Sequence, residues 1–292
     1  MVDNPTIPLD SIKSRMDDLF IFSSQVPYGC KHPLRVVQAS KSLIGINIED
    51  PSRQLLKWLD DYVKDFTPNF NPPFPSDQNL SLETITYTHL ANLIYHKKKS
   101  ESIIYLTQLL QVADPRHIAE FMMELSAQKT PGSFLFCWSA FRSLQFLGEK
   151  NGYAILYHCL SNILEEISDE KNDTKLLMDR CELYCHQFQI RKTTIIRKNK
   201  IIPHLDKMIK TIKQGLNQTY SFNIPKALGS IIRTEGEKGI LSYLATLKME
   251  DISSELILLL DAIRSALKFS DNLEDPVLLS IFNNFREKVH AK

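Results

Sequence analysis

The chain has 292 residues, of which 43% are hydrophobic and 24% are charged, and its formal net charge is +1. This near-neutral balance excludes a global field that would draw the whole molecule to nucleic acid or to an anionic membrane. Only 9 residues are glycine, while leucine, isoleucine, lysine and glutamate are common, so helix is the expected secondary structure.

The first part of the chain predicts three amphipathic helices. Apolar residues recur at helical spacing in 9–23, and a second helix is expected over 33–44, with a proline at its first position. Asp50 and Pro51 predict the start of a third helix, because aspartate caps a helix N-terminus and proline suits the first turn.

A proline-rich segment follows at 67–81, where four of fifteen residues are proline. Such a segment is neither helix nor central strand. Phe70 and Phe74 argue against a free linker, so we expect an ordered segment with both rings packed on the fold. The alternative is a proline-rich ligand for a partner domain.

From residue 82 the helical pattern is almost continuous, and its connections are short. Short links between helices of similar length predict antiparallel neighbours, hence a bundle or a stack of helical hairpins. Asp114 and Asp275 each precede a proline and repeat the start signal of the third helix. The expected helices are 82–96, 100–112, 115–128, 133–147, 152–168, 173–189, 203–216, 224–233, 237–248, 251–268 and 276–288.

The sequence therefore predicts an all-α domain over 1–292 with about 12–14 helices. The stretch 191–202 loses its periodicity and is interpreted as helix or connector before a helix that Pro203 opens. The stretch 218–224 is the candidate boundary between two lobes, 1–218 and 224–292. A hairpin over 133–167 is expected at the centre, because its first helix is apolar on nearly all sides and needs partners on all sides. Gly148 is the expected stop signal between its two helices.

The five cysteines are an odd number, and most lie in apolar periodic segments. We interpret them as reduced, buried side chains of a cytoplasmic protein. No secretory signal and no apolar run long enough to span a bilayer is expected. The sequence also contains no GxxxxGK[ST], GxGxxG, GxSxG or HExxH motif and no paired CxxC.

Two expected helices carry side chains that could bind metal ions. His117, Glu120 and Glu124 share one face of the first helix, and Glu182 and His186 are four residues apart on the second. Carboxylates and imidazoles that project inward from neighbouring helices are typical of di-iron and di-manganese bundles. The pattern lacks the Glu-x-x-His motif of those bundles, however, and chance pairs on a helix surface are the plainer interpretation.

Two further features have competing interpretations. Cys181, Cys185 and His186 could hold a soft metal or do redox work, but buried structural cysteines are favoured. The basic stretch 191–213 could bind phosphate-rich partners such as nucleic acid. No aromatic residues interleave its charges, so a solvated face or pairing with the acidic residues of 165–173 is favoured.

An aromatic set suggests a pocket in the central hairpin. Trp138, Tyr157 and His158, with Tyr153 and Tyr184, could line a site for a flat apolar ligand such as haem or a quinone. A stripe of this kind is more often simply core.

The favoured function is a non-enzymatic helical protein that binds a partner protein or a small apolar ligand between hairpins. The rival is a metal-dependent or haem-using oxidoreductase built in a helical bundle. The two differ in whether His117, Glu120, Glu182 and His186 converge inside the bundle.

Overall fold

The structure is a computed structural model that describes residues 8–29, 32–73, 84–148, 151–165, 173–194, 198–216 and 235–287. Within these ranges it contains thirteen α-helices, one short 3₁₀ helix at Met249–Asp251 and no strand. The predicted all-α fold is confirmed. None of the described helices is long and apolar enough to cross a membrane.

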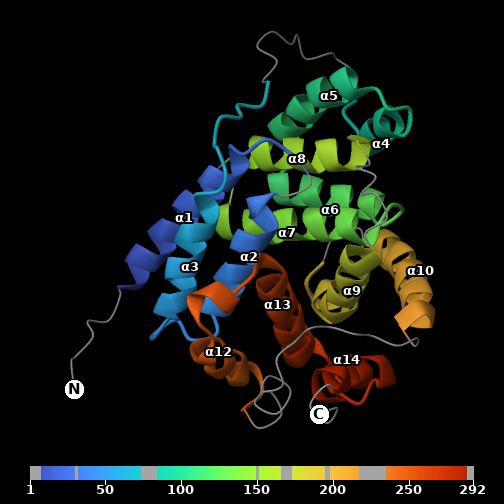
Figure 1. Ribbon diagram of the computed structural model, residues 1–292. Coiled ribbons are helices and arrows are strands. Elements are labelled where there is room, and N and C mark those ends of the chain that lie inside the picture. Colours follow the sequence, from blue (N-terminus) through green and yellow to red (C-terminus); the bar gives the residue numbers. More distant parts are fainter. Residues whose placement is uncertain are drawn as a thin grey trace.

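From α4 to α7 the helices follow one another with short connections, whereas a long segment joins α3 to α4 (Figure 1). Their bounds are α1 Leu9–Ser24, α2 Pro33–Ile44, α3 Arg53–Val63, α4 Tyr87–Tyr95, α5 Lys99–Val112, α6 Pro115–Ser126, α7 Pro131–Leu147, α8 Gly152–Glu165, α9 Asp173–Thr193, α10 Lys198–Leu216, α12 Glu237–Thr246, α13 Ser254–Phe269 and α14 Pro276–Glu287.

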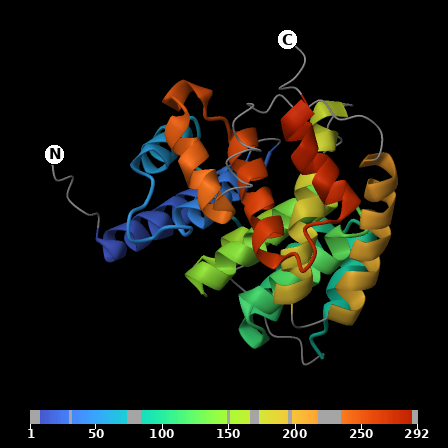
Figure 2. The same ribbon diagram turned by 90° about the horizontal axis from the view of Figure 1, so that it is seen from below.

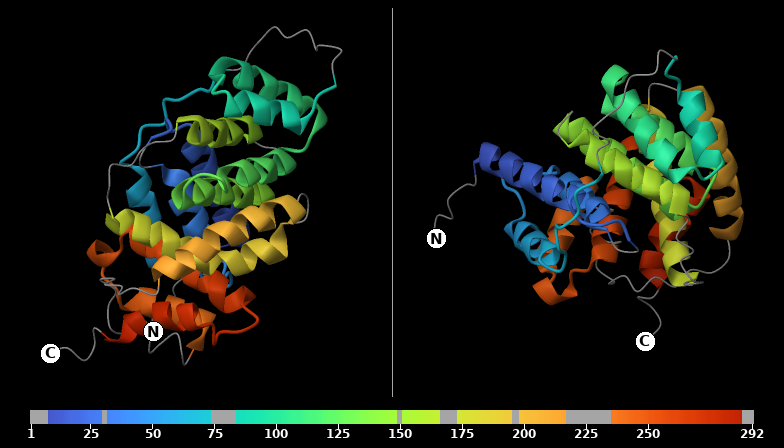
Figure 3. Two further views of the ribbon diagram at one scale, coloured as in Figure 1. Left: turned by 90° about the vertical axis from the view of Figure 1, so that its right-hand side faces the viewer. Right: turned by 90° about the horizontal axis from the view of Figure 1, so that it is seen from above.

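The helices form successive layers around α6, α7 and α8, which pack on one another in the middle of the molecule (Figure 1). The left view of Figure 3 shows the layers, from α4 and α5 at one end to α12 and α14 at the other. Below α7, helices α2, α9 and α13 meet, and α13 packs most extensively on α9 and α2. Seen from below, α10 and α1 lie at opposite edges (Figure 2).

The predicted central hairpin is α7 and α8, and both helices are deeply buried. Every residue from Phe134 to Leu144 is buried, and so is every residue from Ile155 to Ile163. Gly148 ends α7 with φ of +66°, a conformation that glycine adopts without a Cβ penalty. Because α7 has no solvent face over this stretch, any polar side chain it carries must find its partner inside the protein.

Three predicted helix starts were wrong. The helix expected over 82–96 begins at Tyr87, after its N-cap Thr86. Helix α3 begins at Arg53, and its cap is Ser52, whose hydroxyl accepts a hydrogen bond from the Leu55 N–H; Asp50 and Pro51 lie before it. Helix α10 begins at Lys198 and contains Pro203 in its second turn. The predicted helix 224–233 and the lobe boundary at 218–224 lie outside the described residues.

The proline-rich segment is described as far as Pro73. Its Phe70 N–H donates to the Gln25 carbonyl at 2.8 Å, and its Phe70 ring packs on α8. Tyr153 of α8 donates a hydrogen bond to the Pro73 carbonyl. The segment is thus held on the fold from Phe70 to Pro73, whereas Phe74 lies outside the described residues.

Candidate functional site

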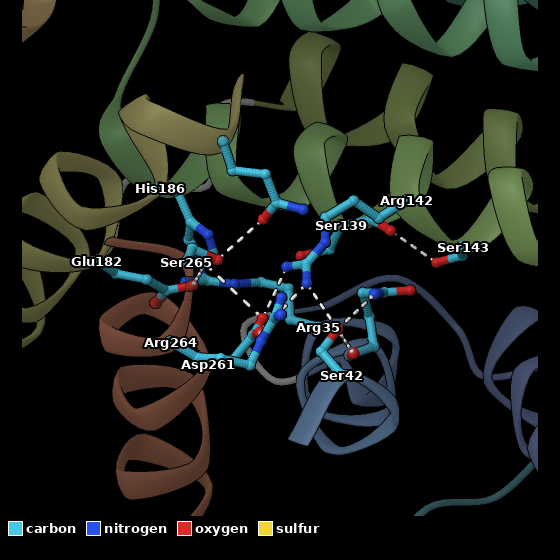
Figure 4. Close-up of polar contacts among 12 residues, drawn as sticks. Arg35, Ser42, Ser139, Arg142, Ser143, Glu182, His186, Asp261, Arg264 and Ser265 are labelled. Carbon is cyan, nitrogen blue, oxygen red and sulfur yellow. Dashed lines mark hydrogen bonds and ion pairs between the residues drawn. The ribbon is translucent and has the colours of Figure 1, made fainter. Parts of the chain in front are cut away.

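Two buried polar clusters contact α7. The first, the central charge network, joins α2, α7, α9 and α13 (Figure 4). Its ionisable members are Arg35, Arg142, Asp179, Glu182, His186, Asp261 and Arg264. The second, the histidine cluster, consists of Tyr28, His32, Phe70, Phe136, Tyr157 and His158.

Asp261 is the hub of the central charge network. Arg142 binds its carboxylate through two hydrogen bonds of 2.7 and 3.1 Å, and the Arg264 Nε donates to it at 3.1 Å. Burial alone would raise the pKa of Asp261, but the two guanidinium groups outweigh burial and hold it well below its usual range. Asp261 is therefore an anion whose charge is balanced by two arginine side chains.

Arg35 links α2 to α9 in the same network. Its Nη2 donates to Glu182 Oε2 at 2.7 Å and to Asp179 Oδ1 at 3.0 Å. Burial raises the pKa of Glu182 to about 7, although the Arg35 charge acts in the opposite direction. Glu182 thus titrates near neutral pH inside the protein.

His186 lies between the two carboxylates without a hydrogen bond to either. Its Nε2 is 3.8 Å from Asp261 Oδ2 and 4.0 Å from Glu182 Oε1, which is beyond hydrogen-bonding distance. Burial lowers the pKa of His186 to about 3; Asp261 opposes this shift and the neighbouring arginines support it. The imidazole is neutral, so it leaves the pairing of charges around it unchanged.

The central charge network has the properties of a structural feature that holds helices together. Its arginines each contact a carboxylate, and Arg142 also donates to Ser42 Oγ at 2.6 Å. Arg142, Glu182, His186 and Asp261 are each at most 5% exposed, so solvent does not reach them. Charges that are buried and already paired hold helices in register, while a substrate would have to break those pairs.

The histidine cluster differs from the central charge network, because it has few polar atoms and most of its side chains are aromatic. The His32 and His158 rings lie edge-on to each other, with centroids 4.6 Å apart and an interplanar angle of 60°. Phe136 packs edge-on against His32 and Tyr28 at 5.3 Å, and the Phe70 ring lies 5.2 Å from His158. The walls come from the α1–α2 connection, α7, α8 and the segment after α3.

Hydrogen bonds to the backbone fix the tautomer of each imidazole. His32 caps α2, and its Nδ1 accepts from the Leu34 N–H at 3.2 Å, so the proton of this ring is on Nε2. The Nε2 of His158 is 2.9 Å from the Ser24 carbonyl, which can only accept, so this nitrogen carries the proton and Nδ1 has the lone pair.

The remaining two nitrogen atoms, Nε2 of His32 and Nδ1 of His158, are buried and have no hydrogen-bond partner. Burial, with His158 nearby, lowers the pKa of His32 to about 3, while the Val26 backbone acts in the other direction. Burial lowers the pKa of His158 to about 4 against the opposing effect of the Ser24 carbonyl. The cluster therefore contains one neutral donor and one neutral acceptor that are buried without a hydrogen bond of their own.

The predicted metal ligands do not assemble into one site. Glu182 and His186 meet in the central charge network, where Arg35 binds the Glu182 carboxylate. Glu120 and Glu124 are buried in α6, but His117 on the same helix is exposed. In the part of the chain that the structure describes, no three His, Cys, Asp or Glu side chains are grouped as metal ligands. The predicted metal centre stays without structural support.

The predicted aromatic pocket is divided between the two clusters. Tyr157 and His158 belong to the histidine cluster, whereas Trp138 packs near Arg142 and His186 of the central charge network. The usual haem-binding nitrogen of a histidine, Nε2, is engaged with Ser24 in His158. His158 is therefore oriented for hydrogen bonding within the cluster.

The cysteines behave as their favoured interpretation predicts. Cys181 and Cys185 are free and buried, and burial raises the pKa of Cys181 to about 12 and that of Cys185 well above its usual range. Such thiols are poor metal ligands and poor nucleophiles.

Along the basic stretch, Arg191 pairs with Asp206, Lys192 with Asp271 at 2.6 Å, and Lys213 with Asp275 at 3.8 Å. These acidic partners lie in α10 and before α14, not in the segment 165–173 that the sequence suggested for the pairing. Arg197 is outside the described residues.

A comparison of the chain with protein-family models, curated protein sequences and solved structures finds no match.

Proposed function

We propose that this chain is a non-enzymatic, all-helical binding protein that holds a small, largely apolar ligand at the histidine cluster. The observation that carries the proposal is the pair of buried nitrogen atoms without partners, His32 Nε2 and His158 Nδ1, on rings 4.6 Å apart. Leaving such groups unpaired costs free energy, and proteins tolerate that cost mainly where a ligand or water completes the pairing.

The chemistry of the two clusters favours binding over catalysis. An acid–base catalyst needs a group that titrates in contact with a substrate. Glu182 titrates near neutral pH, but Arg35 binds its carboxylate in the sealed core. The imidazoles of the histidine cluster stay neutral far below neutral pH. Aromatic walls with a few fixed polar atoms are typical of sites for small apolar ligands.

Titration with indole, followed by side-chain NMR signals, tests the proposal. We expect the Tyr157, His158 and Phe70 signals to shift together and to saturate. The variant Tyr95→Ala is the control, because Tyr95 is 82% exposed and lies outside both clusters, so its removal leaves the response unchanged. Shifts confined to exposed side chains such as Tyr95, or no shifts up to the solubility of indole, would contradict the proposal.

A further inference from the structure

We infer that Lys41 of α2 is a site of reversible carbamate formation with carbon dioxide. The inference goes beyond the proposed function and does not depend on it, because Lys41 lies beside the central charge network. In the reaction, the lone pair of the neutral amine attacks the carbon of carbon dioxide and forms an N–C bond. The electron pair of one C=O π bond moves to its oxygen, and the nitrogen releases a proton to solvent. The product is a carbamate anion.

Lys41 differs from most lysines in its position, because it is half-buried and has no carboxylate bound to it. Its Nζ lies 4.9 Å from the centroid of the Phe146 ring. Within the described residues, no hydrogen bond or ion pair joins this amine to an acidic side chain. The aromatic ring removes water from one side of the amine and supplies only the weak attraction of a cation–π contact in its place. Burial without a paired anion disfavours the ammonium form.

The charged groups that act on Lys41 are two cations and one anion. Arg142 comes from α7, and Asp261 and Arg264 come from α13; both helices pack on α2. Arg142 also donates to Ser42 Oγ at 2.6 Å, so its guanidinium group reaches the residue next to Lys41 (Figure 4). Both guanidinium groups share the single carboxylate of Asp261. The surroundings of the amine therefore carry a net positive charge.

These surroundings make the Lys41 amine a nucleophile near neutral pH. Burial lowers the pKa of Lys41 to about 8. Arg142 and Arg264 act in the same direction as burial, and Asp261 opposes them. At pH 8 about half of the Lys41 amines are therefore neutral, whereas a lysine with the ordinary pKa of about 10.4 is neutral in fewer than about 1 in 100 molecules. A lysine that is desolvated or placed next to a cation is activated in this way.

The same surroundings favour carbon dioxide among the electrophiles that an amine can attack. Carbon dioxide is small and uncharged, so it suits an amine that is half-buried. Its adduct is an anion, so the cations that disfavour the ammonium form stabilise the carbamate. Carbamate formation thus reverses the charge of Lys41 at a point where Arg142 and Arg264 outnumber Asp261.

Carbon-13 NMR of the full chain in ¹³C-labelled bicarbonate at pH 8 tests the inference. We expect a carbamate carbonyl signal that is lost in Lys41→Met, a variant that keeps an apolar stem beside Phe146 and removes the amine. Lys268→Met is the matched control and should retain the signal. Lys268 also lies near a phenylalanine ring, 5.9 Å from the centroid of Phe269, but it is exposed.

Chemical trapping locates the carbamate on the wild-type protein. An alkyl oxonium salt converts a carbamate into a stable ester, and peptide mass spectrometry then identifies the modified residue. This step is needed because an α-amino group has an ordinary pKa of about 8 and forms carbamates too. We expect at least about tenfold more trapped carbamate at Lys41 than at Lys268, in proportion to the larger neutral fraction of Lys41. The comparison decides the inference even if Lys41→Met fails to fold.

Trace labelling with acetic anhydride over a series of pH values measures the reactivity of each amine separately. Labelling of Lys41 should reach half of its maximum near pH 8. A carbamate trapped only at the α-amino group, or equally at Lys41 and Lys268, would overturn the inference. Labelling of Lys41 that follows that of Lys268 at every pH would also overturn it, because the amine would then have no special reactivity. None of these outcomes bears on the histidine cluster.

Discussion

At the scale of single residues, Asp261 has the largest predicted effect on stability. Its carboxylate compensates Arg142 and Arg264, and all three side chains are buried. Asp261→Asn leaves two guanidinium groups facing a neutral amide, so we expect it to lower the free energy of unfolding by about 3–5 kcal/mol. Urea denaturation measures this loss.

The matched control for Asp261 is a carboxylate in an exposed ion pair. Glu101 pairs with Lys98 at 3.1 Å on the surface of α5, with about half of each side chain exposed. Glu101→Gln should change the free energy of unfolding by less than about 1 kcal/mol. Comparable losses in the two variants would mean that the central charge network does not stabilise the fold as a buried network should.

A second prediction at this scale concerns Gly132 in the first turn of α7. A Cβ atom at this position would lie 2.7 Å from Asp179 Oδ2, and Arg35 holds that carboxylate in place. Gly132→Ala should therefore destabilise the protein by about 1–3 kcal/mol in thermal or urea denaturation.

Gly29→Ala is the control for Gly132, because nothing lies within 4 Å of its added Cβ. It should change the stability by less than about 0.5 kcal/mol. A neutral Gly132→Ala would show that α7 and α9 are farther apart than the structure has them.

At the scale of elements, the sequence predicted which segments are helical better than where they begin. The start signals at Asp114 and Asp275 are confirmed, since each carboxylate accepts from a backbone N–H of the first turn. At α3 two capping residues flank Pro51, and the local pattern does not decide between Asp50 and Ser52. At α10 the buried stripe Ile201, Leu205, Ile209 and Leu216 extends the helix to the N-terminal side of Pro203.

The start of α3 provides a prediction at the scale of elements. Ser52 Oγ accepts from the Leu55 N–H at 3.3 Å, so Ser52→Ala should lower the free energy of unfolding by about 1 kcal/mol. Asp50 is exposed and precedes the helix, so Asp50→Ala should have little effect. The reverse order of effects in urea denaturation would place the cap at Asp50, as the sequence pattern predicted.

The candidate sites were only partly predictable from the sequence. Glu182 and His186 have helical spacing, so the sequence revealed them as a pair. Arg35 and Arg142 were missed, because their partners are 147 and 119 residues away in the chain and no local spacing reveals such pairs. The one signal for Arg142 was a charged residue in an otherwise apolar helix. His158 was among the predicted pocket residues, whereas His32, in the connection before α2, was missed because no helical spacing relates the two residues.

At the scale of the whole molecule, buried histidines make stability depend on pH. Folding lowers the pKa values of His32, His158 and His186 to about 3, 4 and 3. As pH falls, these histidines therefore take up protons in the unfolded chain before they do so in the folded protein. Their stabilisation is fully present above pH 6.5 and is lost as pH falls through the folded pKa values. Glu182 acts in the opposite sense, because its folded pKa is raised to about 7 and it stabilises the fold at low pH.

The three histidines and Glu182 act in opposite senses, and the histidines outweigh the glutamate. The free energy of unfolding should therefore fall by about 3 kcal/mol for each pH unit as pH is lowered from 6.5 to 4.5. Urea denaturation at several pH values measures this slope. His158→Gln removes one titrating group and should reduce the slope by about 1.4 kcal/mol per pH unit. An unchanged slope in this variant would mean that His158 does not stay neutral in the folded protein.

The protonation of the two imidazoles in the histidine cluster tests the central claim most directly. Long-range ¹H–¹⁵N NMR at pH 7 reports which nitrogen carries the proton in each ring. We predict neutral rings with the proton on Nε2 in both His32 and His158, and a shift of the His158 Nδ1 signal when indole is added. A charged ring, a proton on Nδ1 of either histidine, or an Nδ1 signal that ignores the probe would contradict the account.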